Sequence, residues 1–157
     1  MQKKIVKTYS FNALGFPIIL HNVPMKKMMG EWVLDVNLNE LQKFIVNLLC
    51  LKQTPLTGAE VRFIRKYFEM TKTAFAKIAG VSHAAVAKWE NHETKNAQIS
   101  LSTETCIRLF ALEKLYPDND DFVRLYKTVA LRHFTYESTM KQQLLTVDIQ
   151  EEFDIAC

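Results

Sequence analysis

The sequence predicts a mainly α-helical fold, in which a small N-terminal module of one β-hairpin and one helix precedes a domain of five helices. Three observations lead to this expectation. Apolar residues recur at helical spacing through most of the chain between residues 38 and 129. The runs begin at Ser, Thr, Asn or Asp residues that can cap a helix. Only residues 15–37 combine β-branched and aromatic residues with proline and glycine, as short strands and their turns do.

The composition is that of a globular protein. The chain has 157 residues, of which 48% are hydrophobic and 24% are charged, which suffices for one ordinary domain or two small ones. It has no apolar run of about 18 residues and no N-terminal signal pattern, so we expect a cytoplasmic protein without a membrane partner. The expected parts are a hairpin-and-helix module that could dimerise at 1–53, a five-helix domain at 54–134 and an acidic tail at 135–157.

The N-terminal module should hold a short β-hairpin, or a pair of edge strands, followed by an amphipathic helix. Gly15–Asn37 supplies strand-forming residues around a central glycine, although their alternation is imperfect. Asn37 and Glu40 form a capping pattern in which each side chain can satisfy the other's backbone donor. A helix is therefore expected over 38–51, and its apolar residues are Leu41, Phe44, Ile45, Leu48 and Leu49.

The five-helix domain begins at a second capping box, Thr57–Glu60, after a short linker at 52–56. The inward stripe of its first helix consists of Val61, Ile64 and Phe68. Ser100 or Ser102 should cap a fourth helix. A turn at 116–119 then precedes a fifth helix, whose apolar stripe is Phe122, Leu125, Tyr126 and Val129. From about residue 135 the pattern fades, so the acidic end is either disordered or ordered by a partner.

Residues 72–89 have the spacing of a helix-turn-helix. Their apolar positions are those that pack two short helices crossing at a steep angle. These residues are Phe75, Ala79, Val81, Val86 and Trp89. Ala76 is small enough to let the second helix approach closely. The alternative is an ordinary helical hairpin, which would not require all of these residues together.

The ends of both short helices are also marked in the sequence. Gly80 can adopt positive φ without a Cβ clash, so the first helix can end there. Thr71 can cap the start of the first helix and Ser82 the start of the second. The segment therefore predicts two capped helices joined by one tight turn, and such a unit is typical of proteins that bind duplex DNA.

Residues 57 to about 112 resemble the Cro/repressor type of helix-turn-helix domain, also called the XRE type. The matching stretches are EVRFIRKYFEMTKTAFAKIAG, VSHAAVAKWEN and TETCIRLFALEKL. The resemblance implies a scaffold ion pair between Arg65 and Glu90. The chain departs from the family in two places: Lys72 replaces the usual glutamine, and the segment His92–Ser100 is several residues longer than expected.

The second helix of the motif would present its N-terminal turns to the bases of the major groove. The candidate base-reading residues are His83, Ala84, Ala85 and Lys88. The candidate phosphate contacts, which flank the helix ends, are Lys72, Thr73, Asn91 and Lys95. The alternatives are that His83 is idle and that Lys95 is merely a solvated charge. Because the reading face is sparsely polar, phosphates and DNA shape should supply much of the affinity.

The charge distribution agrees with a polyanionic partner. The net charge of +3 is small, but residues 1–57 carry +4, residues 58–98 carry +3 and residues 99–157 carry −4. The first two-thirds of the chain could therefore present a basic face to DNA, while the acidic third should face elsewhere.

Three classes of function follow from these observations. The first is a homodimeric, sequence-specific transcription regulator that binds a palindromic operator. The second is an antitoxin that binds a toxin protein, because the layout, with Asn22–Pro24 and Gly30–Glu31 ahead of the helix-turn-helix, is similar to antitoxins of the MqsA/YgiT type. This chain lacks the paired cysteines with which that family binds zinc. The third class, an enzyme, is disfavoured because no nucleophile motif or glycine-rich phosphate loop is present.

No cofactor, metal or disulfide is expected. The three cysteines, Cys50, Cys106 and Cys157, are widely separated and odd in number. The four histidines show no metal-ligand spacing. Buried or free thiols are the simplest interpretation of the cysteines.

Overall fold

The computed structural model describes residues 1–118, 120, 123 and 142–153. The chain divides into two compact units, one of Met1–Leu41 with Leu144–Cys157 and one of Gln42–Gln143. In sequence, the second unit is thus an insertion between two parts of the first. This division differs from the expected boundaries at residues 53 and 134, because a C-terminal strand pairs with an N-terminal one.

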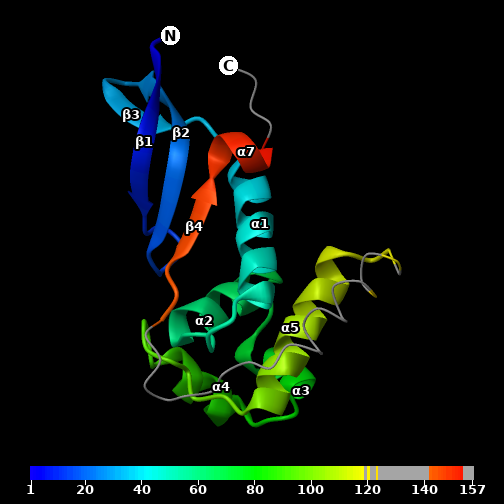
Figure 1. Cartoon of the computed structure of the whole chain (residues 1–157). Helices are drawn as coiled ribbons and strands as arrows, with labels where there is room; N and C mark the ends of the chain where they lie inside the picture. Colours follow the sequence, from blue (N-terminus) through cyan, green and yellow to red (C-terminus); the bar gives the residue numbers. More distant parts are fainter. Residues whose placement is uncertain (119, 121–122, 124–141, 154–157) are drawn as a thin grey trace. The chain divides into compact units, whose positions relative to one another are not determined.

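A four-stranded mixed sheet forms the first unit (Figure 1). β1 (Lys3–Phe11) is antiparallel to β2 (Ile18–Met28), and β3 (Glu31–Leu34) is antiparallel to the C-terminal part of β2. β4 (Leu145–Asp148) runs parallel to the N-terminal part of β2 and leads directly into the short helix α7 (Ile149–Phe153). β2 therefore pairs with each of the other three strands.

One edge of β2 is shared by two partners. Residues 18–21 pair with β4 and residues 25–28 pair with β3. Between them Asn22 has a φ of 52°, and Pro24 has no N–H to donate. Buried side chains lie at even positions before Asn22 and at odd positions after it. The register against β1 is the same before and after Asn22. Asn22 is therefore a local irregularity without an extra residue, and the buried positions change from even to odd across it.

The prediction of a mainly α fold is wrong, because the described chain contains this mixed sheet as well as helices and is α/β. The expected hairpin corresponds to β2 and β3, but two strands were missed. β1 is an exposed strand with Lys3, Lys4 and Lys7, so its sequence lacks apolar alternation. β4 has only four residues and lies in the segment expected to be an acidic tail.

The helices follow the sequence pattern more closely. They are α1 (Leu38–Leu51), α2 (Gly58–Tyr67), α3 (Lys72–Ala79), α4 (His83–Glu90) and α5 (Leu101–Leu115). The helix predicted over 38–51 is confirmed, and Ser100 rather than Ser102 caps α5. The predicted fifth helix of this domain, with Phe122, Leu125, Tyr126 and Val129, lies outside the described residues. None of the described helices is long and apolar enough to cross a membrane.

Asp148 joins β4, α7 and β2 within the first unit. Its Oδ1 accepts the backbone N–H groups of Gln150 and Glu151 and so caps α7. Its Oδ2 accepts a hydrogen bond from Asn22 Nδ2 at 2.7 Å. One carboxylate therefore holds the C-terminal strand and helix to Asn22 of β2.

Asp148→Ala should lower the free energy of unfolding by about 1–2 kcal/mol, because α7 loses its cap and the Asn22 amide loses its acceptor. Urea unfolding followed by tryptophan fluorescence measures this change. The control Glu151→Ala removes an exposed carboxylate from the same turn and should change stability by less than about 0.5 kcal/mol. Equal losses for the two variants would contradict the joining role of Asp148.

Candidate nucleic-acid interface

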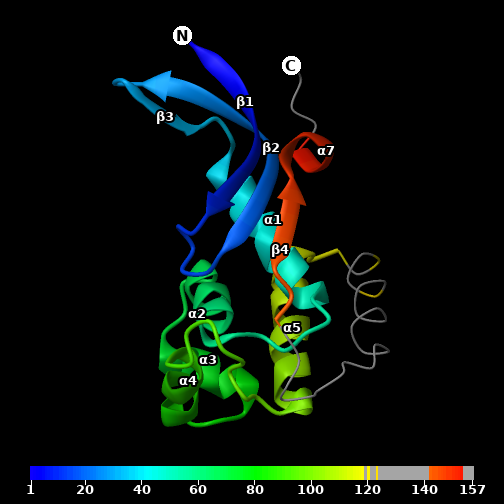
Figure 2. The same cartoon turned by 60° about the vertical axis from the view of Figure 1, so that its left-hand side comes forward.

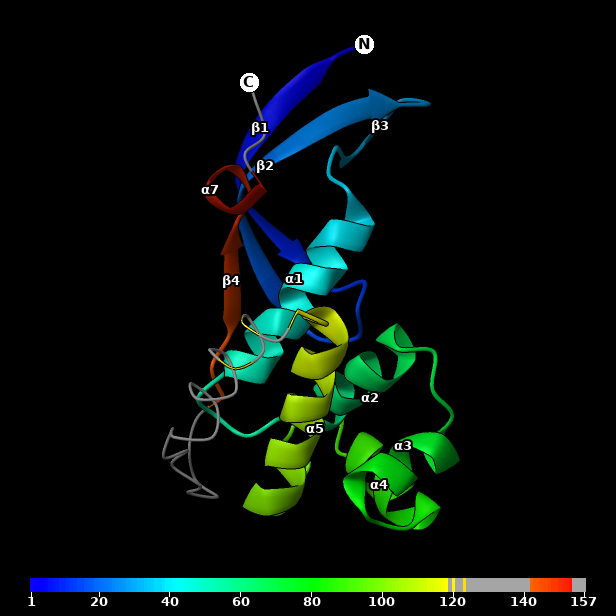
Figure 3. The ribbon, with the colours of Figure 1, turned by 90° about the vertical axis from the view of Figure 1, so that its right-hand side faces the viewer.

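α3 and α4 pack against each other across a tight turn (Figure 3). Thr71 Oγ1 accepts the N–H of Ala74 at 3.1 Å, which caps α3. Ser82 Oγ accepts the N–H of Ala85 at 3.2 Å, which caps α4. Gly80 ends α3 with a φ of 68° in the left-handed region. The two caps and the glycine turn predicted from the sequence are confirmed.

The contact between these helices is apolar. The residues that the spacing placed inside are buried, with the exception of Val81, which is half-buried. The buried residues are Phe75, Ala76, Ala79, Val86 and Trp89. α2 also contacts α4, and α5 contacts α3. α4 is therefore held by neighbours on one side, which leaves its other side to solvent.

The candidate base-reading residues lie on that solvent side. His83, Ala84 and Lys88 are exposed, and Ala85 is half-buried. α4 is only eight residues long, about two turns of helix, and these four side chains lie within its first six residues. The structure therefore leaves His83, Ala84 and Lys88 accessible on α4, while Ala85 lies at the margin of its buried side.

The candidate phosphate-binding residues lie in two environments. Thr73, Asn91 and Lys95 are exposed. Lys72 is half-buried, and its Nζ lies 3.9 Å from Oε2 of Glu90. Lys72 therefore already has an anionic neighbour, which the sequence did not indicate.

The Glu90 carboxylate, at the end of α4, is buried and surrounded by cationic side chains. Arg65 donates from Nε to Oε1 at 2.6 Å and from Nη2 to Oε2 at 3.1 Å, and Glu90 is only 2% exposed. Arg62 Nε lies 3.8 Å from the same carboxylate, and Arg62 Nη2 donates to the Glu90 carbonyl at 2.7 Å. With Lys72, three cations face one carboxylate, which ties α2 and α3 to the end of α4.

Sequence reasoning missed the role of Arg62, although its spacing offered a signal. Arg62 precedes Arg65 by one helical turn, so both guanidinium groups lie on one face of α2. Arg62 also contacts the exposed Glu93, with Nη2 and Oε1 3.4 Å apart. Two arginines at this spacing, together with one glutamate at the end of α4 and another three residues later, could have indicated the cluster.

The N-terminus of α2 fits closely against the segment after α4. A Cβ at Gly58 would lie 2.3 Å from the Trp89 carbonyl oxygen, so only glycine is accommodated there. The N–H groups of Gly58 and Ala59 donate to the carbonyls of Lys95 and Glu93. The long segment that follows α4 thus supplies acceptors for the first turn of α2.

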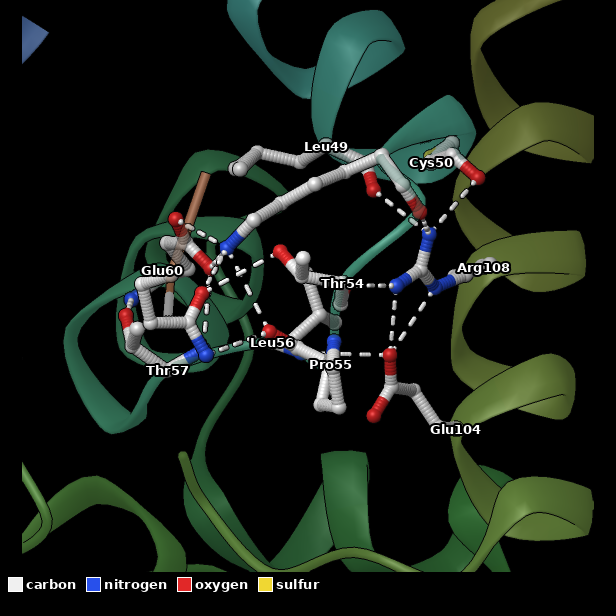
Figure 4. A network of polar contacts seen from close by, with 11 residues as sticks. Leu49, Cys50, Thr54, Pro55, Leu56, Thr57, Glu60, Glu104 and Arg108 are labelled. Carbon is white, nitrogen blue, oxygen red and sulfur yellow. Dashed lines mark hydrogen bonds and ion pairs between the residues drawn. The ribbon is translucent and has the colours of Figure 1, made fainter. Parts of the chain in front are cut away.

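A buried network of polar side chains underlies this arrangement (Figure 4). Arg108 of α5 is 1% exposed and contacts Glu104 through both Nε and Nη2. Its Nη1 and Nη2 also donate to backbone carbonyls at the end of α1 and in the following linker, namely those of Leu49, Cys50, Lys52 and Thr54. Arg108 therefore satisfies acceptors that the end of α1 leaves open.

Lys52 and Glu60 form the second half of the network. Lys52 Nζ donates to both carboxylate oxygens of Glu60, at 2.9 and 2.8 Å, and to Gln142 Oε1 at 2.6 Å. Burial lowers the pKa of Lys52, while the Glu60 carboxylate opposes this shift. Burial also raises the pKa of the nearby Cys50 thiol to about 12, so this thiol is protonated at neutral pH.

Glu104 connects the two halves. Its Oε1 accepts the N–H of Leu56 at 3.2 Å as well as the Arg108 contacts. Its Oε2 is buried without a hydrogen-bond partner among the described residues. The sequence assigned Lys52 to a linker and gave no role to Glu104 or Arg108, although their separation of four residues is typical of a helical ion pair.

Comparison with protein-family models, with curated proteins and with solved structures finds no match to this chain. Within residues 1–118 and 142–153, no three His, Cys, Asp or Glu side chains gather in a way that could hold a metal ion. Cys50 is buried and Cys106 is exposed, and both are free thiols.

Gly58→Ala should lower the free energy of unfolding by about 3 kcal/mol, because the added methyl group overlaps backbone atoms of Trp89 and Glu93. Chemical denaturation measures the change. The control Glu113→Ala, on the exposed face of α5, should leave stability within about 0.5 kcal/mol of the wild type. A Gly58→Ala variant with the same free energy of unfolding as the wild type would show that α2 and the segment after α4 are loosely packed.

Arg108→Met should destabilise the fold by about 3–5 kcal/mol, because it leaves the buried Glu104 carboxylate without a cation. The double variant Arg108→Met with Glu104→Gln should recover part of this loss, since the uncompensated charge is removed. The test compares the free energies of unfolding of Arg108→Met, of Glu104→Gln and of the double variant. A double variant less stable than Arg108→Met would contradict the charge argument.

Proposed function

We propose that this chain is a sequence-specific transcription regulator that binds duplex DNA with α4 in the major groove. The observation that carries the proposal is the pair α3 and α4, joined at the left-handed Gly80 and packed on a buried apolar contact. A helix held on one side and exposed on the other can enter a groove about 12 Å wide. The resemblance to the Cro/repressor type supports the same assignment.

The exposed side chains of α4 suit base recognition. Lys88 can donate to O6 and N7 of guanine, and His83 can donate or accept at a base edge. The alanines at 84 and 85 allow close approach and can contact a thymine methyl group. Because only two polar side chains take part, contacts to phosphates should contribute a large share of the affinity.

Lys72, Thr73, Asn91 and Lys95 are the proposed phosphate contacts. Thr73 and Lys72 lie in the first turn of α3, and Asn91 and Lys95 follow the end of α4. The Glu90 carboxylate near Lys72 limits the free motion of its ammonium group and so fixes a cation beside α4. A cation placed in advance loses less conformational entropy when it binds a phosphate.

A single α4 would read a half-site of only a few base pairs. We therefore propose that the chain acts as a homodimer on a palindromic operator, with two copies of α4 about 34 Å apart. Binding to DNA upstream of its own gene would make the regulator autoregulatory. Such a protein would act in the cytoplasm.

An antitoxin that also binds a toxin is the second candidate. One observation favours it: residues from both ends of the chain form a separate compact unit, which the helix-turn-helix does not require for its own core. Such a unit would be available to bind a protein partner. Co-expression with the product of an adjacent gene, followed by co-purification, tests this candidate.

Lys88→Ala should reduce the preference for the operator over random duplex DNA by about 1–3 kcal/mol, because a base contact is lost. Lys72→Ala should weaken binding to both duplexes and reduce the slope of log affinity against log salt by about 0.9, because a phosphate contact is lost. Fluorescence anisotropy with the upstream DNA and with a random duplex measures both effects.

The matched control is Lys43→Ala, which removes an exposed lysine from α1 and should leave the affinity and the salt slope unchanged. Wild-type protein that binds both duplexes equally would contradict sequence specificity. Protein that binds neither duplex would contradict the proposed function itself.

A further inference from the structure

A tight turn joins β2 to β3 (Figure 2). It carries an apolar side chain, Met29, in a backbone conformation that disfavours it. Met29 has a φ of 50° and Gly30 a φ of 88°, as in two-residue hairpin turns of type I′. Asn-Gly is the preferred pair in such turns, because Asn tolerates the left-handed region. Met29 is 103% exposed, so no packing within the described chain compensates for the strain.

This exposed methionine has an apolar neighbour. Met28 is 47% exposed and directly precedes it at the end of β2. Strained backbone that carries exposed apolar side chains is a feature of binding sites, where the contact that uses the side chain also favours the strained conformation. Methionine suits such a contact, because its flexible, polarisable thioether adapts to irregular surfaces.

Four lysines lie beside the turn, and they point to both faces of the β-ribbon. Lys3 is paired with Lys26 across β1 and β2, and Lys4 and Lys27 follow them in the two strands. Successive residues of a strand point to opposite faces. Each face of the ribbon therefore carries two of these lysines.

Three of these ammonium groups are oriented by neighbours. The Asp35 carboxylate lies 2.9 Å from Lys3 Nζ and 3.1 Å from Lys26 Nζ, and these hydrogen bonds lower the pKa of Asp35. Lys4 Nζ lies 4.2 Å from the centre of the Trp32 ring. With the acidic residues Asp35 and Glu31 counted, this end of the ribbon still has an excess of two positive charges.

We propose that the β2–β3 turn, residues 26–32 with Lys3 and Lys4, enters a groove of duplex DNA. The proposal rests on the proposed function. A groove has a phosphate backbone along each wall, which matches cations on both faces of a ribbon, whereas an anionic membrane presents charge to one side only. The lysines would contact the two walls, while Met28 and Met29 contact base or sugar edges between them.

The small size of the turn also favours DNA. Two methionine side chains are too few for stable insertion into a membrane, since even one myristoyl chain binds only marginally. A turn that belongs to a chain already bound to DNA needs little intrinsic affinity, because the effective concentration of the second contact is high. A weak apolar and cationic contact can therefore matter on DNA.

The decisive variant is Met29→Asn, which provides the residue that this turn prefers. It should be at least as stable as the wild type, yet bind the upstream duplex about tenfold more weakly, because an apolar contact is lost. Lys27→Gln should reduce the salt slope by about 0.9 through loss of one phosphate contact. Thermal unfolding and fluorescence anisotropy over a salt series provide the measurements.

Two control variants match these changes. Leu144→Asn removes an exposed apolar side chain next to β4, whose first residue pairs with the opposite end of β2, and Lys43→Gln removes an exposed lysine from α1. Both should bind DNA like the wild type. Lys88→Ala, measured alongside, tests the proposed function independently of the turn.

Each outcome distinguishes the two proposals. If Lys88→Ala weakens binding while Met29→Asn and Lys27→Gln bind like the wild type, the turn does not contact DNA although α4 does. If these two turn variants keep DNA binding but lose binding to vesicles containing phosphatidylserine, the turn is a membrane contact and the proposal is overturned. Wild-type protein that binds no duplex would overturn both proposals.

Discussion

The buried guanidinium of Arg108 is the interaction on which the rest of the second unit depends. Arginine remains charged at any physiological pH, so burying it costs several kcal/mol unless its donors find acceptors. Here the end of α1 and the linker after it supply carbonyl oxygens, and Glu104 supplies the countercharge. One side chain of α5 thereby fixes where α1 ends and how the chain proceeds to α2.

A series of hydrogen bonds connects Arg108 to the helix-turn-helix. Glu104 also accepts the N–H of Leu56, just before the capping box that starts α2. Glu60 of that box binds Lys52, which closes the network. α2 then positions α4 through the close fit at Gly58 and through Arg65 and Glu90. The orientation of the proposed recognition helix thus depends on buried charge as well as on apolar packing.

How far the sequence predicted this structure depends on the distance along the chain over which each interaction acts. Caps and turns are local, so Thr57, Thr71, Gly80 and Ser82 could be identified from neighbouring residues. The burial of Arg108 could not, because its backbone acceptors lie more than fifty residues earlier and a helical Arg–Glu pair at this spacing is usually exposed to solvent.

In the sheet, too, pairing between nearby residues could be predicted and pairing between distant residues could not. β3 follows β2 after a two-residue turn and could be predicted, whereas β4 follows it after the whole second unit. In the candidate interface, the exposed residues of α4 followed from helical spacing. The approach of Lys72 to Glu90 did not, since it depends on how α3 crosses α4. Lys72 therefore contacts Glu90 within the fold and could also contact an anionic partner.

The shared edge of β2 has a consequence for the order of folding. Asn22 and Asp148, which hold β4 in place, are 126 residues apart in sequence, so β2 is synthesised long before its parallel partner. Until β4 arrives, residues 18–21 present an unpaired edge, which is prone to pair with other chains. In the folded second unit Lys52 binds Gln142, three residues before β4, and this contact replaces a long, entropically costly loop by a short one. Folding of the inserted unit before β4 pairs should therefore shorten the loop that this pairing has to close.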